Sequence, residues 1–132
     1  MKKLKNKAQY FVDAEFRKCT PPCSIDDMQQ AFLDKLDELR FNAGIPLVLS
    51  CAYRSVEYDK KKGRSGKSAH CSGLAVDIRC TTGINRLKII SAARRVGINR
   101  MGINRNYIHV DMGERVGLPC SVWVYDDKGN AV

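Results

Sequence analysis

The chain is organised around the segment Ser68-Ala69-His70-Cys71-Ser72-Gly73-Leu74-Ala75-Val76-Asp77. A second segment, Tyr107-Ile108-His109-Val110-Asp111, follows further along, and each segment contains one of the two histidines of the chain. A catalytic zinc typically takes three protein ligands from histidines and carboxylates and leaves a fourth position for water or substrate. His70, Asp77 and His109 form one such set. On spacing alone, a structural role for Asp77 and two ordinary polar histidines fit equally well.

Two short strands are predicted on these segments, because each alternates between apolar and polar positions. Asp77 lies on the polar side of the first strand, and His109 lies on the polar side of the second. If the apolar sides share one core, Asp77 and His109 lie on the same exposed floor, and His70 in the preceding loop completes the set. The apolar positions are Leu74, Val76 and Ile78 in the first strand and Ile108, Val110 and Met112 in the second.

These residues resemble motifs of the zinc D-alanyl-D-alanine carboxypeptidase family. That family includes the L-alanyl-D-glutamate endopeptidases of phage lysins, and vancomycin-resistance dipeptidases are its relatives. The matching pattern is Ser68-x-His70-x-x-Gly73-x-Ala75-x-Asp77, followed by Ile108-His109-Val110-Asp111. Upstream, Leu49–Arg54 is similar to the family's strand ending in Ser-Gly-Tyr-Arg, with Cys51-Ala52 in place of one glycine. Ile25–Gly44 is similar to the preceding helix, so the resemblance covers residues 11–124.

The resemblance implies a zinc peptidase that cleaves peptide bonds in the stem peptides of bacterial peptidoglycan. The activity is expected to be of the D-Ala-D-Ala carboxypeptidase or the L-Ala-D-Glu endopeptidase type, and the fold is the one shared with the Hedgehog signalling domain. The implied cofactor is Zn²⁺, and the implied metal ligands are His70, Asp77 and His109. Arg54 is implied as a catalytic and substrate-binding residue, since a permanently charged guanidinium stabilises an oxyanion or binds a carboxylate.

Other readings of the candidate substrate contacts stay open. Ser68 either hydrogen-bonds the substrate or fixes its own loop, and Tyr107 is expected to line the cleft. Trp123 also fits the cleft, although core packing is the preferred prediction for it. For Arg54 the structural alternative is an ion pair with an acidic residue of the following loop, Glu57 or Asp59.

The general base is the point at which the sequence departs from the family pattern. Many members carry Glu or Asp three residues before the last zinc histidine, where this chain has Asn106, which takes no proton at neutral pH. Asp111 is the preferred replacement because it shares a strand face with His109, and Glu114 in the next turn is the alternative. Asp111 has a second possible role, which is to orient a ligand histidine. Without a base, the chain would be a catalytically weak zinc module that binds cell-wall peptides or a protein partner.

The 132 residues predict one domain over 1–132, with residues 1–9 as a flexible basic arm. The predicted class is α+β, a small antiparallel sheet of about four strands with helices packed against one side. The expected helices are at 24 or 26 to 44 and at 84–96, and the second is expected to turn Leu87, Ile90 and Ala93 inward. Further strands are expected at 46–50 and 122–125. The remaining segments are expected to be irregular at 7–17, a polar loop at 56–67 and a turn-rich connection at 97–105.

The net charge of +9 predicts attraction to polyanions, either nucleic acid or bacterial cell wall. The sequence shows no nucleic-acid motif and no aromatic residues within the basic cluster at 60–67, so peptidoglycan peptide is the expected partner and nucleic acid is not. No apolar run reaches the length of a membrane span. The basic start at 1–7 lacks the apolar core of a signal peptide. We expect a monomer made in the cytoplasm that acts at the bacterial wall, in the periplasm or after lysis-type release.

The six cysteines are expected to be mainly free, small buried residues. Only Cys19 and Cys23 have a short spacing, which also fits a local disulfide or a metal clip. Cys71 is next to His70 but is expected to be a loop residue beside the site.

Overall fold

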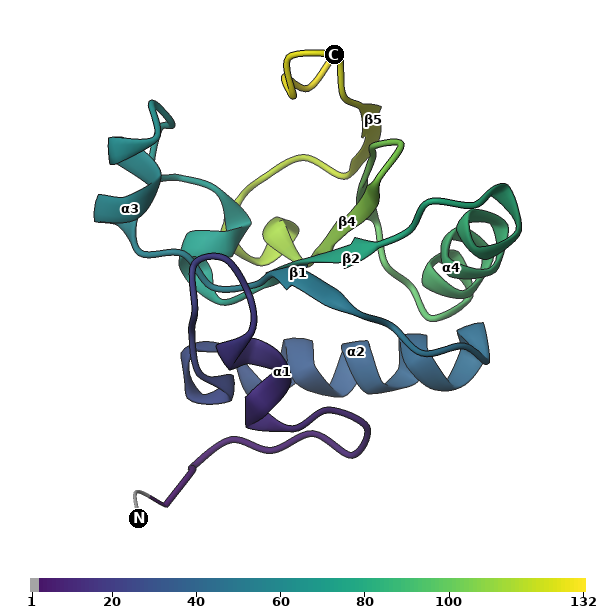
Figure 1. Ribbon diagram of the computed structural model, residues 1–132, viewed down its shortest axis with the longest axis horizontal. Helices are drawn as coiled ribbons and strands as arrows, with labels where there is room; N and C mark the ends of the chain where they lie inside the picture. Colours follow the sequence, from purple (N-terminus) through teal and green to yellow (C-terminus); the bar gives the residue numbers. More distant parts are fainter. Residues whose placement is uncertain (1–2) are drawn as a thin grey trace.

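A computed structural model describes residues 3–132 and shows an α+β fold, which confirms the predicted class (Figure 1). Its helices and 3-10 turns pack around a single sheet. The elements are α1 (Asp13–Arg17), η1 (Ile25–Asp27), α2 (Gln30–Ala43), β1 (Leu49–Cys51), α3 (Val56–Lys61), η2 (Ala69–Ser72), β2 (Ala75–Arg79), α4 (Gly83–Arg95), β3 (Arg100–Ile103), β4 (Tyr107–Asp111), η3 (Gly113–Val116) and β5 (Ser121–Val124). None of the described helices has the length and apolar character needed to cross a membrane.

The sheet has five strands in the order β1-β2-β4-β3-β5 and is mixed rather than purely antiparallel. The β1–β2, β2–β4 and β4–β3 pairs are antiparallel, whereas β3 and β5 run parallel. The strand missing from the sequence prediction is β3, which lies in the segment expected to be a turn-rich connection. Gly102 and the flanking Gly and Asn residues disguise it, because these residue types are depleted in strands.

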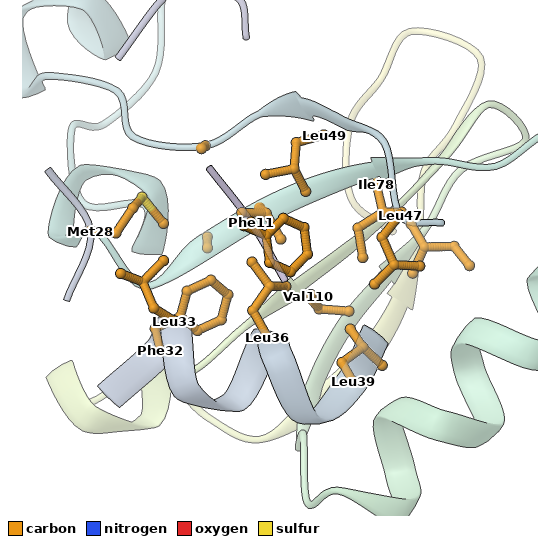
Figure 2. Packing of buried hydrophobic residues seen from close by; sticks show 14 of the residues in the cluster. Phe11, Met28, Phe32, Leu33, Leu36, Leu39, Leu47, Leu49, Ile78 and Val110 are labelled. Carbon is orange, nitrogen blue, oxygen red and sulfur yellow. The ribbon is translucent and has the colours of Figure 1, made fainter. Parts of the chain in front are cut away.

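The core lies between α2 and the sheet (Figure 2). Four side chains of α2 that are fully buried face the sheet: Phe32, Leu33, Leu36 and Leu39. They meet residues of the strands and their approaches, among them Leu47, Ile78 and Val110. Each buried aliphatic or aromatic side chain of this size stabilises the fold by roughly 1.5–3 kcal/mol. The apolar sides of β2 and β4 therefore pack on α2, and the opposite face of the sheet remains for polar side chains.

The start of the predicted long helix differs from the sequence expectation. Ser24 caps only the short turn η1, where its Oγ accepts a hydrogen bond from Asp26 N at 3.2 Å. The chain then becomes extended at Met28, and Gln29 N donates to Gly73 O at 3.0 Å. This contact ties the start of α2 to the turn that carries His70. The helix ends as expected, with Gly44 in the left-handed conformation at φ 69°.

Three other segments also differ from their predictions. The N-terminal segment contains the short helix α1, and the predicted polar loop begins with α3, because Ser55 Oγ accepts from Tyr58 N at 3.0 Å and caps it. The inward face of α4 is formed by Ile89, Ala92 and Ala93, and Leu87 is 68% exposed. The predicted inward position for Leu87 is therefore wrong, because the buried stripe follows the i, i+3, i+4 spacing from Ile89.

The predicted basic arm at 1–9 lies against α2 and η1 over part of its length. Asn6 N donates to Asp26 Oδ1 at 2.8 Å, and Gln9 N donates to Asp37 Oδ2 at 2.7 Å. Residues 1–2 of the arm lie outside the described residues. The contacts of residues 5–10 attach the arm to the domain in this structure.

Candidate metal centre

The candidate site lies on one row of paired residues that crosses all five strands. The Cα partners run in the order Cys51, Asp77, His109, Gly102 and Trp123, from β1 to β5. Directly paired residues place their side chains on the same face of a sheet. The antiparallel pairing of β2 and β4 therefore puts Asp77 and His109 side by side on the face that is turned away from α2.

His70 reaches the same point from η2, the short turn before β2. Ser68 caps this turn by accepting a hydrogen bond from His70 N at 3.1 Å, and Gly73 ends it at φ 68°. A Cβ on Gly73 would lie 2.4 Å from Asp27 O, so only glycine fits this turn. His70 Nδ1 is 2.5 Å from Ala52 O, to which it donates, and Nε2 lies 3.3 Å from Asp77 Oδ1. The backbone carbonyl thus fixes the tautomer that leaves Nε2 free to bind a metal.

His109 is held by a carboxylate rather than by a carbonyl. Its Nδ1 lies 2.9 Å from Asp77 Oδ1, and its Nε2 lies 2.5 Å from Asp111 Oδ2. The other oxygen of Asp111 accepts from Arg100 Nε at 2.6 Å and from Gly113 N at 2.7 Å. Asp111 therefore uses both oxygens within the protein, and its position suits the orientation of His109 better than proton transfer from a water molecule.

The titratable groups of this cluster stabilise one another in their charged forms. Burial opposes the negative charge of Asp77, but His70 and His109 outweigh burial and hold the pKa of Asp77 well below its usual range. Burial also opposes the charge of Asp111, whereas the hydrogen bond from His109 lowers its pKa. For His109 burial lowers the pKa, and the two carboxylates reverse this and raise it to about 9. A buried carboxylate, Asp111, and a half-buried one, Asp77, thus contact the same imidazole.

The donor types present fit zinc, which binds His nitrogen, carboxylate oxygen and Cys sulfur. Asp77 Oδ1 lies between His70 Nε2 and His109 Nδ1, so the residues predicted as ligands are brought together. Among the described residues, the one set of donors whose ligand atoms all lie within 4.8 Å of one another is Cys51, His70 and Asp77, which does not include His109. Burial raises the pKa of the Cys51 thiol to about 12, so this group is protonated without a metal. Sequence spacing gave no sign of Cys51, since its pairing with Asp77 depends on the register of β1.

A cleft of about 660 Å³ lies over the row of donors. One wall carries basic side chains, Arg54, Arg64 and Lys67. The Arg54 guanidinium donates to Ser68 Oγ at 3.1 Å, and its Nε is 3.2 Å from Asp59 Oδ1, which confirms the ion pair that was the structural alternative for Arg54. Arg54 and Ser68 still line the cleft, so the pair holds the guanidinium in place beside the donors.

The other wall is aromatic and contains Tyr107, Trp123 and Tyr125. The Trp123 ring lies 5.4 Å from the His109 ring, measured between centroids, and the Arg100 guanidinium lies 4.9 Å from the Trp123 centroid. The prediction that Trp123 packs in the core is therefore wrong. Gly102 explains the arrangement, because a Cβ there would lie 2.4 Å from Trp123 Nε1 and 2.7 Å from the Tyr125 hydroxyl. Because Gly102 has no side chain, the rings of Trp123 and Tyr125 both fit over β3.

Neither Glu114, the alternative base, nor Asn106, at the position of the usual acid, lines this cleft. Asn106 is exposed on the turn before β4, and the Glu114 carboxylate is 3.4 Å from Asn99 Nδ2. The carboxylates among the described residues that line the cleft are Asp59, Asp77 and Asp111. Each of these three contacts a cationic or imidazole side chain.

A model of the family described as Peptidase M15 matches residues 9–111. The chain belongs to the peptidase M15 family. This confirms the resemblance seen in the sequence, and the family is that of the zinc D-Ala-D-Ala carboxypeptidases. Among curated proteins, none matches this chain.

Membership of peptidase M15 implies a metal-dependent peptidase with a peptide substrate. The matched segment contains Arg54, His70, Asp77 and His109, so each implied role falls on a residue near the cleft floor. It ends at residue 111, before Trp123, so β5 and its part of the aromatic wall lie beyond the match.

Proposed function

We propose that the protein is a zinc-dependent peptidase that cleaves stem peptides of bacterial peptidoglycan, with His70, Asp77 and His109 as its metal ligands. The observation that carries this proposal is the convergence of two imidazole nitrogens on Asp77 Oδ1 at the floor of the cleft. Both imidazoles are oriented through their other nitrogen, one by Ala52 O and one by Asp111. Such outer contacts are typical of metal-binding histidines.

The walls of the cleft support a peptide that carries carboxylates. The volume of about 660 Å³ is within the range of small-ligand sites, which are roughly 300–1,000 Å³. Arg54, Arg64 and Lys67 supply positive charge on one side, and the opposite aromatic wall supplies apolar contact area. Stem peptides combine free carboxylates with short apolar side chains, and the net charge of +9 favours approach to an anionic wall.

In the proposed reaction, bound zinc supplies a Lewis acid that polarises the scissile carbonyl and lowers the pKa of bound water. The protein supplies the geometry around it. Asp111 accepts from His109 Nε2 and thereby leaves Nδ1 free to bind the metal. Arg54 is held by Ser68 and Asp59 and binds a substrate carboxylate or the developing oxyanion. Tyr107 lines the cleft beside His109 and contacts the substrate.

A second candidate is a catalytically weak zinc module that binds wall peptides. The contacts of Asp111 favour it, because both oxygens of this carboxylate already accept short hydrogen bonds. In either case we propose a monomer that acts at the bacterial cell wall, with peptidoglycan peptide as its partner.

The first test is the zinc content of the purified wild type and of His109→Ala, followed by digestion of purified peptidoglycan. We expect about one zinc per chain in the wild type and little in the variant, as one three-ligand site requires. New amino termini should then appear with the loaded wild type only. If the wild type bound zinc and was retained on peptidoglycan but released no new amino termini, the proposed peptidase would be wrong and the binding module would take its place. A wild type that takes up no zinc would overturn both.

A further inference from the structure

Cys51 differs from the other buried cysteines of the described chain in its surroundings. Cys19, Cys23 and Cys80 belong to the main hydrophobic cluster, whereas Cys51 is buried but does not. Its sulfur lies 3.9 Å from His70 Nδ1. The sulfurs of Cys19, Cys23 and Cys80 instead contact backbone carbonyls of Glu15, Phe16 and Thr82.

The backbone of β1 turns Cys51 toward the site. Leu49 pairs with Ile78, and Cys51 pairs with Asp77, so β1 has one more residue than β2 between the two pairs. In a regular strand Leu49 and Cys51 would point to the same face. The irregular register separates them: Leu49 stays in the core, and Cys51 joins Asp77 on the site face. Bulges of this kind re-aim side chains and are enriched near active sites.

Cys51, Asp77 and His109 consequently lie on three neighbouring strands in one row, with His70 above Asp77. Asp77 is the central residue and has one further donor on each side. Tetrahedral zinc with Zn–N of about 2.0 Å and Zn–S of about 2.3 Å needs an N···S separation of about 3.5 Å. The donor atoms of Cys51, His70 and Asp77 all lie within 4.8 Å of one another, so these side chains must move closer together to bind one ion.

We infer that Cys51 is a fourth protein donor to the metal, bound as a thiolate together with His70, Asp77 and His109. Four protein donors make a closed site, whereas a catalytic zinc keeps one position for water or substrate. Cys51 therefore occupies the open position in the resting protein, and it must leave before a peptide is cleaved. This inference rests on the proposed metal centre and adds a latent state to the proposed peptidase.

Cobalt substitution tests the donor independently of activity. Wild-type protein loaded with Co²⁺ should show a near-ultraviolet thiolate-to-cobalt charge-transfer band. Cys51→Ser should bind cobalt but lose the band. Cys71→Ser is the matched control, because Cys71 is the sequence neighbour of His70 and its sulfur contacts Ser55 O at 3.9 Å. That variant should retain the band.

X-ray absorption of the zinc-loaded wild type gives the same answer without any substitution. A sulfur neighbour at about 2.3 Å supports the inference, and only nitrogen and oxygen neighbours at about 2.0–2.2 Å overturn it. If Cys51→Ser does not fold, this measurement and Cys51→Ala decide. A band that persists in Cys51→Ser also overturns the inference.

Digestion of peptidoglycan separates this inference from the proposed function. Cys51→Ala should release new amino termini faster than wild type does from the first minutes of digestion. A wild type with the sulfur signal and no cleavage, with Cys51→Ala equally inactive, would retain the fourth donor and overturn the peptidase. Cleavage by a wild type without the sulfur signal would retain the peptidase and overturn the fourth donor. Failure to bind any metal would overturn both.

Discussion

His70 and His109 turn an imidazole nitrogen toward the same oxygen of Asp77, but they are held by different kinds of structure. His70 lies in a short turn, and its second nitrogen donates to the backbone carbonyl of Ala52. His109 lies in the middle of β4, and its second nitrogen contacts the carboxylate of Asp111. Asp111 is in turn fixed by Arg100 on the neighbouring strand β3.

Because of this difference, a side-chain substitution can remove the contact that orients His109 but not the contact that orients His70. The carbonyl that orients His70 is part of the backbone, so it remains whatever residue stands at position 52. The orientation of His109 depends on two charged side chains that are both largely buried. We therefore expect the site to tolerate changes around His70 better than changes around His109, although both histidines are needed as ligands.

The largest expected effect is a loss of metal affinity, and it should be similar for substitutions of His70 and of His109. His70→Ala and His109→Ala each remove one proposed ligand, so the metal affinity should fall more than the roughly 10–100-fold that loss of an outer contact costs. Equilibrium dialysis against zinc measures this. Lys128→Ala, in the exposed tail, should bind as wild type does. Retained affinity in His109→Ala alone would leave Cys51, His70 and Asp77 as the metal-binding set.

The second effect should appear on the His109 side only. Asp111→Asn keeps the shape of the side chain but weakens its hold on His109 Nε2, so zinc affinity should fall by roughly 10–100-fold. Asp127→Asn is the matched control, because Asp127 is 95% exposed and pairs only with Arg105. Unchanged affinity together with lost turnover would contradict the orienting role and would make Asp111 the general base.

The two histidines also show which parts of the site can be predicted from the sequence. Alternation of apolar and polar residues is local information, and it was enough to place Asp77 and His109 on the polar sides of β2 and β4. The helix α2 and its glycine end were equally visible, since their signals lie within a few residues of one another. The turn of His70 carries its own marks, a capping serine and a glycine with positive φ.

What the sequence did not predict depends on contacts between distant segments. Cys51 reaches the site because of a register shift between β1 and β2, and no local pattern encodes such a shift. Trp123 lines the cleft because β5 pairs with β3 and because Gly102 has no side chain. Gly102 is also the reason that β3 was not predicted, because glycine is depleted in strands. The same residue therefore accounts for the missed strand and for the missed aromatic wall.

The third effect should come from filling the space at Gly102. In Gly102→Ala the new Cβ meets Trp123 and Tyr125, so both rings must shift and the free energy of unfolding should fall by about 1–3 kcal/mol. Trp123 is the single tryptophan of the chain, so its fluorescence reports the shift directly. Gly83→Ala is the control, because no atom lies within 4 Å of a Cβ there. An unchanged emission spectrum would show that the rings are not held against β3.

The smallest effect should come from the caps of two short segments. Ser68→Ala removes the hydrogen bond to His70 N, and Thr82→Ala removes the one to Asn85 N at the start of α4. Each substitution should lower the free energy of unfolding by about 1 kcal/mol in denaturant titrations.

Only Ser68→Ala should also weaken zinc binding, because the turn that it caps carries His70, whereas α4 supplies no residue to the cleft. The weakening should be smaller than that of Asp111→Asn, since the carbonyl of Ala52 still orients the ring. If Ser68→Ala reduced zinc affinity as much as Asp111→Asn does, the backbone contact would not be sufficient to hold His70. The two sides of Asp77 would then depend equally on side chains.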